Sequence, residues 1–109
     1  MPHLRFRGLS SPQVQQISET LVIRIAELTQ TPSAHFTCEW VATHFFSEGK
    51  PTAGEPFCEV LWFDRGAEME KRVAQAITGF IQKLVPEKDV VVVFTMLGKN
   101  HYFENGEHF

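Results

Sequence analysis

The stretch "HLRFRGLSSPQVQQISETLVIRIAELTQTPSAHFTCEW" (residues 3–40) decides the fold, because its pattern predicts a strand, a helix and a second strand. "HLRF" (3–6) alternates polar and apolar residues, which is typical of a strand with one buried face. Ser11 and Pro12 then predict the helix start, with Ser11 as the N-cap. Alternation resumes over 35–46, which predicts the second strand. Between them, apolar residues recur at helical spacing, at Val14, Ile17, Leu21, Ile25 and Leu28.

The second half of the chain repeats this plan. "FCEVLWF" (57–63) predicts a third strand, 64–85 a second helix capped by Asp64, and 89–97 a fourth strand. A shift of 56 positions superimposes the two apolar patterns without a gap, so 1–46 and 57–103 form pseudo-repeats within one domain, 1–109. Residues 47–56 are expected to be a linker. The tail, 99–109, is expected to hold a short strand at "HYF" and a turn at Asn105-Gly106.

The repeat predicts an α+β fold with duplicated βαβ units. Right-handed crossovers would place both helices on one face of a four-stranded mixed sheet. The other face is not covered by helices, yet "VVVVF" (90–94) is apolar on both of its sides, and Leu61 and Phe63 are apolar opposite Val60 and Trp62. We therefore expect the second face to pack against another subunit. The alternative is that the aromatic tail covers it.

Composition excludes several classes of partner. The net charge is −3 and no run of Lys or Arg occurs, so we expect no nucleic-acid partner. No apolar run approaches the roughly 18 residues of a membrane span, and no signal peptide is evident, so we expect a cytoplasmic protein without a membrane partner. Cys38 and Cys58 are expected to be reduced, buried thiols in strands. The five histidines lack zinc-like spacing, and we expect neither a metal nor a cofactor.

Two groups of proteins share this βαβ–βαβ plan. One is the ferredoxin-like group, which includes RNA-recognition and small-molecule regulatory domains. An RNA-recognition domain stacks bases on a basic and aromatic strand. The third strand here carries Glu59 and no Lys or Arg, which argues against RNA binding. A ligand-binding regulatory domain stays open on this evidence.

The second group is the tautomerase superfamily, which includes 4-oxalocrotonate tautomerase and macrophage migration inhibitory factor. The chain resembles it in having Pro2 directly after Met1 in "MPHLRFRG" (1–8), a duplicated strand–helix–strand unit, and "THFF" (43–46) at the end of the second strand. Together with "EVLWFDRG" (59–66) and "YFENGEHF" (102–109), the opening is similar to a small uncharacterised bacterial family that we place in this superfamily. The resemblance implies a homotrimer with threefold symmetry.

The resemblance also implies that Pro2 is a general base. A chain-terminal amine has a pKa of about 8, and an apolar pocket or a neighbouring cation lowers this pKa further. A base poised near the working pH transfers protons best, and proline holds its nitrogen in a fixed backbone geometry. The nitrogen of Pro2 is a base only after Met1 has been removed, because with Met1 attached it is an amide.

An acidic substrate would also need a cation and a hydrogen-bond donor. Arg65, in the loop after the third strand, is the substrate-binding arginine that the resemblance implies; the alternative is a surface residue paired with Asp64 or Glu68. Arg5 and Tyr102 are further substrate-binding candidates, although each can also be structural. The sequence therefore predicts a tautomerase or isomerase acting on a small, acidic keto–enol substrate. The alternatives are a non-catalytic oligomeric binding or regulatory protein, or another reaction at the same site, such as decarboxylation or hydration.

Overall fold

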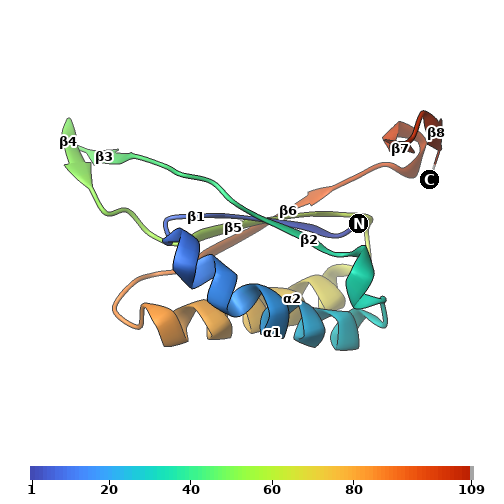
Figure 1. Cartoon of the computed structure of the whole chain (residues 1–109), viewed down its shortest axis with the longest axis horizontal. Helices are drawn as coiled ribbons and strands as arrows, with labels where there is room; N and C mark the ends of the chain where they lie inside the picture. The colour runs from blue at the N-terminus through green and yellow to red at the C-terminus, as the bar shows by residue number, and fades with distance from the viewer. Residues whose placement is uncertain (109) are drawn as a thin grey trace.

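A four-stranded mixed sheet with two helices on one face forms the body of the protein (Figure 1). The computed structural model describes residues 1–108; Phe109, the last residue of the predicted tail, lies outside them. The strand order is β2-β1-β5-β6, with parallel pairs β1–β2 and β5–β6 and an antiparallel pair β1–β5. The predicted α+β fold is confirmed. The strands are β1 (His3–Arg7), β2 (Thr37–Trp40), β5 (Phe57–Trp62) and β6 (Val91–Met96), and the helices are α1 (Ser11–Thr29) and α2 (Ala67–Leu84).

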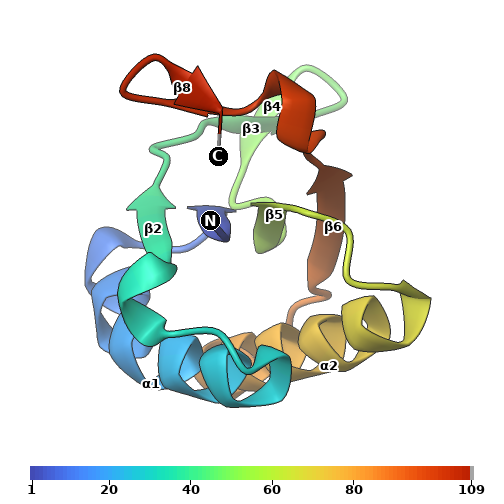
Figure 2. The same ribbon diagram turned by 90° about the vertical axis from the view of Figure 1, so that its right-hand side faces the viewer.

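The two βαβ units follow the repeat seen in the sequence. Helices α1 and α2 begin 56 positions apart and lie side by side beneath the sheet (Figure 2). Their apolar stripes pack against the even-numbered side chains of β1 and β5, among them the fully buried Phe6, Val60 and Trp62. Burial of these side chains is the main force holding the helical layer on the sheet. The buried helix residues are Val14, Ile17, Leu21 and Ile25 of α1 and Val73, Ile77 and Ile81 of α2.

Both helix starts differ from the sequence prediction. Ser10, not Ser11, is the N-cap of α1, because its side chain accepts a hydrogen bond from the Gln13 N–H and the Gln13 side chain bonds back to the Ser10 N–H. This reciprocal capping box satisfies two amides at the helix start. Asp64 does not cap α2, which begins after Gly66. The Asp64 carboxylate instead accepts a hydrogen bond from the Gly66 N–H at 2.8 Å, and so closes the turn before the helix.

The second strand is much shorter than the predicted 35–46. The short 3-10 helix η1 (Ser33–His35) leads into β2, which ends at Trp40. The chain then leaves the sheet, and β3 (Phe45–Ser47) pairs with β4 (Lys50–Thr52) in a hairpin. The predicted linker, 47–56, is therefore partly a strand. Glu48 and Gly49, both with positive φ (53° and 76°), form the tight turn that a two-residue hairpin loop requires.

A second hairpin ends the described part of the chain. After η2 (Lys99–His101), β7 (Phe103–Glu104) pairs with β8 (Glu107–His108) around the predicted Asn105-Gly106 turn. The expected strand at "HYF" thus begins at its last residue. Both hairpins stand on the side of the sheet opposite the helices (Figures 1 and 2).

The open face of the sheet is not covered by the tail. Val91 and Val93 of β6 remain 39% and 37% exposed, so the alternative in which the aromatic tail buries this face is wrong for the single chain. Within residues 1–108, no helix is long and apolar enough to cross a membrane.

Candidate active site

Pro2 lies at the start of β1, at the end of the sheet that also carries the C-terminal hairpin (Figure 1). Its side chain is fully buried and, by alternation with Leu4 and Phe6, lies on the helix-covered side of the sheet. Its carbonyl oxygen accepts a hydrogen bond from the Thr37 N–H at 3.1 Å. The Met1 ammonium donates a hydrogen bond to the His35 carbonyl oxygen at 3.0 Å. With Met1 attached, the Pro2 nitrogen is held as an amide.

A cavity of about 330 Å³ lies directly beside this terminus. It brings together the chain start, the η1–β2 junction and the C-terminal segment, which are far apart in the sequence. Its volume is at the lower end of the range for small-molecule sites. The lining residues are Met1, Ala34, His35, Thr37, Tyr102 and Glu104. Met1 forms one wall, so its removal would enlarge the cavity next to Pro2.

Two buried hydrogen-bond donors sit at the end of β5. Extending the β1–β5 register by one position from the His3–Leu61 pair sets Pro2 opposite Trp62. The Trp62 Nε1 and Arg65 Nε are both buried and have no hydrogen-bond partner among residues 1–108. They are the only buried side-chain donors or acceptors in that range without one. Orphaned buried donors are costly and uncommon, so this pair calls for an explanation.

Arg65 packs over the Trp62 ring, with 5.4 Å between its guanidinium carbon and the ring centroid. Burial lowers the pKa of Arg65 from its usual value. Within residues 1–108, Arg65 forms no ion pair with Asp64 or Glu68, so the surface-pair alternative does not describe this structure. An incompletely paired guanidinium next to a buried indole suits an anionic ligand.

Tyr102 lines the cavity and packs edge-to-face against Phe63, with ring centroids 5.4 Å apart. The Lys99 ammonium lies over the same Phe63 ring at 5.8 Å, which adds a second cation near this end of β5. Pro2, Arg65 and Tyr102 therefore lie toward one end of the sheet, but of the three only Tyr102 lines the cavity.

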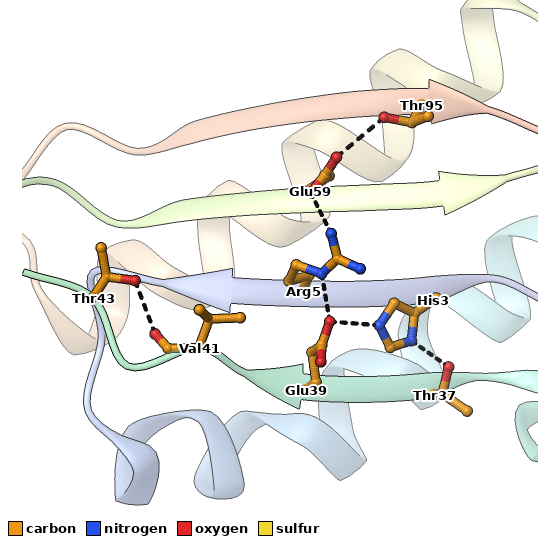
Figure 3. A network of polar contacts seen from close by, with 8 residues as sticks. All are labelled: His3, Arg5, Thr37, Glu39, Val41, Thr43, Glu59 and Thr95. Carbon is orange, nitrogen blue, oxygen red and sulfur yellow. Dashed lines mark hydrogen bonds and ion pairs between the residues drawn. The ribbon is translucent and has the colours of Figure 1, made fainter.

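Arg5 lies elsewhere, on the open face of the sheet (Figure 3). Its guanidinium bonds the Glu39 carboxylate on β2 and, at 3.1 Å, the Glu59 carboxylate on β5. Glu59 also accepts a hydrogen bond from Thr95 on β6, and Glu39 contacts His3 at 3.0 Å. These bonds hold the pKa of Glu39 below its usual value, with His3 as the largest cause and Arg5 next. Arg5 is separated from Pro2's ring by the sheet and is already paired.

Sequence reasoning missed two features of this arrangement. Trp62 was identified only as a core residue, although its position one step beyond the His3–Leu61 pair could have placed it beside Pro2. The ionic line Glu39–Arg5–Glu59 was also missed. The sequence does place opposite charges at open-face positions of three strands. These positions can be recognised as neighbours only once the strand order is known.

The described residues do not gather a metal-binding set: in 1–108, no three His, Cys, Asp or Glu side chains could together hold an ion. Cys38 and Cys58 are free thiols in β2 and β5; Cys58 is buried as expected, whereas Cys38 is only partly buried. Burial raises the pKa of Cys38 to about 11 and also raises that of Cys58, which keeps both thiols protonated at neutral pH. Neither is suited to nucleophilic chemistry.

Comparison with known proteins identifies close relatives. The family described as "Domain of unknown function (DUF1904)" matches residues 1–108. The crystal structure of a DUF1904 domain from Sebaldella termitidis is 38% identical, covers 100% of both chains and has a TM-score of 0.94. No curated protein matches this sequence.

More distant structures share the fold. A macrophage migration inhibitory factor-like protein from Entamoeba histolytica is 12% identical over 99% of this chain and 98% of its own, with a TM-score of 0.77. A fused 4-OT described as an asymmetric trimer is 10% identical over 97% of this chain and 94% of its own, with a TM-score of 0.82. The fold is therefore tautomerase-like, and at these identities the likeness concerns the fold alone.

Proposed function

This chain belongs to the DUF1904 family, and from that membership and its tautomerase-like fold we propose that it is a tautomerase or isomerase. Pro2, freed by removal of Met1, is the general base. The substrate is a small keto–enol compound with an acidic group, and no metal or cofactor takes part.

The observation that carries the proposal is a pair of buried donors, one on Trp62, which the extended strand register sets opposite Pro2, and one on Arg65, which packs on the Trp62 ring. Trp62 Nε1 and Arg65 Nε are desolvated, preorganised and without partners in residues 1–108. Donors of this kind stabilise negative charge that develops on an oxygen, because they need no reorganisation during the reaction. A purely structural site would satisfy such donors internally. A substrate oxygen bound next to Pro2 would explain both of them.

The proton balance of the reaction is simple. The uncharged Pro2 amine takes the proton from the enol hydroxyl, and the oxygen becomes an enolate held by the N–H groups of Trp62 and Arg65. The Pro2 ammonium then gives the proton to the substrate carbon, which forms the C–H bond of the ketone. One O–H bond breaks and one C–H bond forms, with no change in oxidation state. Pro2 ends in its starting, uncharged form.

Two measurements test the proposal in sequence. The intact mass of the native protein reports whether Met1 is present; a fully retained Met1 would exclude Pro2 as a base. If Met1 is absent, ketonisation of phenylenolpyruvate is followed by its ultraviolet absorbance. We expect Pro2→Ala and Arg65→Gln each to lower kcat/KM about 100-fold, as loss of a base or an oxyanion donor typically does.

A matched control is available at the other end of β1. Arg7 lies over the Phe57 ring at 5.4 Å, the same distance at which Arg65 lies over Trp62, but it is at the opposite end of the strand from Pro2. Arg7→Gln should keep the wild-type rate. Equal rates in wild type, Pro2→Ala and Arg65→Gln would contradict the proposal.

One observation favours a second candidate, a non-catalytic binding or regulatory protein. Pro2 is fully buried, and while Met1 is attached its nitrogen is an amide that cannot act as a base. This candidate predicts that small keto acids bind the wild type and Pro2→Ala equally well, without being converted by either.

We also propose that the chain assembles as a homotrimer in the cytoplasm. The fused 4-OT, which shares this fold, is described as a trimer. The open face exposes Val91 and Val93, and the hairpins on the same side carry Phe46 (68% exposed) and Phe103 (58% exposed). Exposed apolar groups gathered on one side suit a subunit interface. The two free thiols suit a reducing compartment. Sedimentation at micromolar concentration tests assembly, and a clean monomer would contradict it.

A further inference from the structure

A groove between α1 and α2 is separate from the Pro2 site. It has a cavity volume of about 510 Å³, larger than the cavity beside Pro2. Its walls are two helices that run side by side under the sheet (Figure 2). This volume lies within the range of small-molecule sites. The lining residues are Arg24, Leu28, Arg72, Gln75, Ala76, Gly79, Phe80 and Lys83.

The charges in this groove have one sign. Arg24, Arg72 and Lys83 line it, and no carboxylate does. Within residues 1–108, none of the three forms an ion pair. The chain as a whole carries a net charge of −3, so this concentration of positive charge runs against the average of the molecule. Clefts lined by one sign of charge attract ligands of the opposite sign.

The groove also has an apolar part. Phe80, Leu28 and Ala76 contribute to its lining, and the Lys83 ammonium lies 5.8 Å from the Phe80 ring centroid. An aromatic face next to a cation suits a ligand with a flat or apolar body and an acidic group.

Gly79 is the least expected residue of the lining. It lies in the interior of α2, where glycine is less favourable than alanine because it loses more backbone freedom on folding. Its φ is not positive, and a Cβ at this position would meet no atom within 4 Å. Neither backbone geometry nor packing within the chain therefore requires glycine. What glycine does here is leave the groove open.

The first repeat does not carry the glycine and the cations that α2 contributes to the groove. At the positions 56 residues earlier, Gly79 corresponds to Ile23 and Lys83 to Glu27, and Arg72 corresponds to Gln16. The cationic groove is thus not a by-product of the amphipathic pattern that both helices share.

We propose that the α1–α2 groove binds an elongated organic anion that has an apolar or aromatic midsection and acidic groups. Arg72 and Lys83 are separated by about 16 Å along the helix axis, so the cations are spread along the groove. Arg24 lines the same groove from α1, and between Arg72 and Lys83 the α2 side of the groove carries the small residues Ala76 and Gly79. The proposal does not depend on Pro2 or on proton transfer.

The test uses naphthalene-2,6-dicarboxylate as the probe. Backbone amide shifts are recorded for the full chain during titration, and affinity is measured by calorimetry. We expect shifts confined to α1 and α2, and an affinity at least about fivefold higher than for the neutral 2,6-dimethanol analogue. The double variant Arg24→Gln/Arg72→Gln should lose about tenfold or more in affinity. Lys71→Gln, on α2 but outside the groove, is the matched control and should bind as the wild type does.

The variant Gly79→Leu tests whether a loss of binding can occur without a loss of stability. Leucine is a strong helix former and its Cβ has free space, so the variant should melt at or above the wild-type temperature while its side chain fills the groove and weakens binding. Equal affinity for the diacid and the diol, undiminished binding to either variant, or no binding by the wild type would each overturn the proposal. The proposal would also be overturned if the protein sedimented with phosphatidylserine vesicles while the diacid caused no amide shift. That result would indicate that the groove contacts lipid.

Discussion

Replacement of Arg65 by Met should stabilise the protein while it lowers the proposed tautomerase activity. The buried Arg65 Nε lacks a partner in residues 1–108, and an unsatisfied buried donor costs about 2 kcal/mol. Methionine keeps the length of the side chain and has no such donor. The substitution also removes the contact with the Trp62 ring, worth about 1 kcal/mol. The net effect is a gain of about 1 kcal/mol in the free energy of unfolding, or a rise in Tm of about 4 °C.

Arg7→Met provides the comparison for this prediction. Arg7 makes the same kind of contact, with Phe57 at 5.4 Å, but it has no buried orphan atom. Its replacement should lower the free energy of unfolding by about 0.5–1 kcal/mol and Tm by about 2–4 °C. Both are measured by thermal unfolding followed by circular dichroism, with the tautomerase rate recorded in parallel. If Arg65→Met melts at or below Arg7→Met, the orphaned donor is not a source of instability, and the reasoning that assigns it to a ligand fails.

Three further predictions concern the ionic line, the thiols and the core. The pKa of Glu39 is lowered in the folded state, so its stabilising effect is present above the unfolded pKa of about 4.3 and is lost as the pH falls through the folded value. Glu39→Gln should therefore lose less stability than the wild type on acidification below about pH 4.5, in urea titrations; an identical decline would show that Glu39 is not the cause. Because the pKa of Cys38 is about 11 and that of Cys58 is also raised, neither thiol should react appreciably with iodoacetamide at pH 7.5 until urea unfolds the chain, and rapid alkylation of the folded protein would contradict this assignment. Ile77→Ala, at a fully buried position of α2, should lower the free energy of unfolding by about 2–5 kcal/mol, whereas a loss below about 1 kcal/mol would mean that the helical layer packs loosely.

The sheet and both helices were predictable because each pattern carries a physical constraint. Leu21 and Ile77 are fully buried on stripes that could be read from spacing alone, and the shift of 56 residues located the second unit before any contact was known. Helix starts were less certain. Neighbouring serines offer equal capping signals, and only the reciprocal bonds between Ser10 and Gln13 distinguish them.

The second strand and the linker could not be predicted in detail. The alternation of Phe36, Cys38 and Trp40 breaks at Val41 and Ala42, but the apolar residues continue to Phe46, and the prediction therefore extended the strand beyond Trp40, where the chain leaves the sheet. The β3–β4 hairpin depends on a turn with positive φ at Glu48, a residue type that does not signal this conformation.

The candidate site was partly predictable. Pro2 and Arg65 followed from the resemblance, and the alternation of "HLRF" is enough to place His3 on the open face, where it contacts Glu39. The orphaned donor of Trp62 could not be found from sequence, because an aromatic residue on a buried strand gives no sign of whether its N–H has a partner.

The proposed chemistry depends most on the state of the nitrogen of Pro2, and one titration reports it directly. The chain has six prolines, and in protein labelled with [15N]proline only one with a free amine can change its nitrogen shift by protonation. We predict that one proline resonance titrates, with a pKa below the ordinary value of a chain-terminal amine, and that it vanishes in Pro2→Ala. A spectrum in which no proline nitrogen titrates between pH 4 and pH 10 would contradict the proposed chemistry.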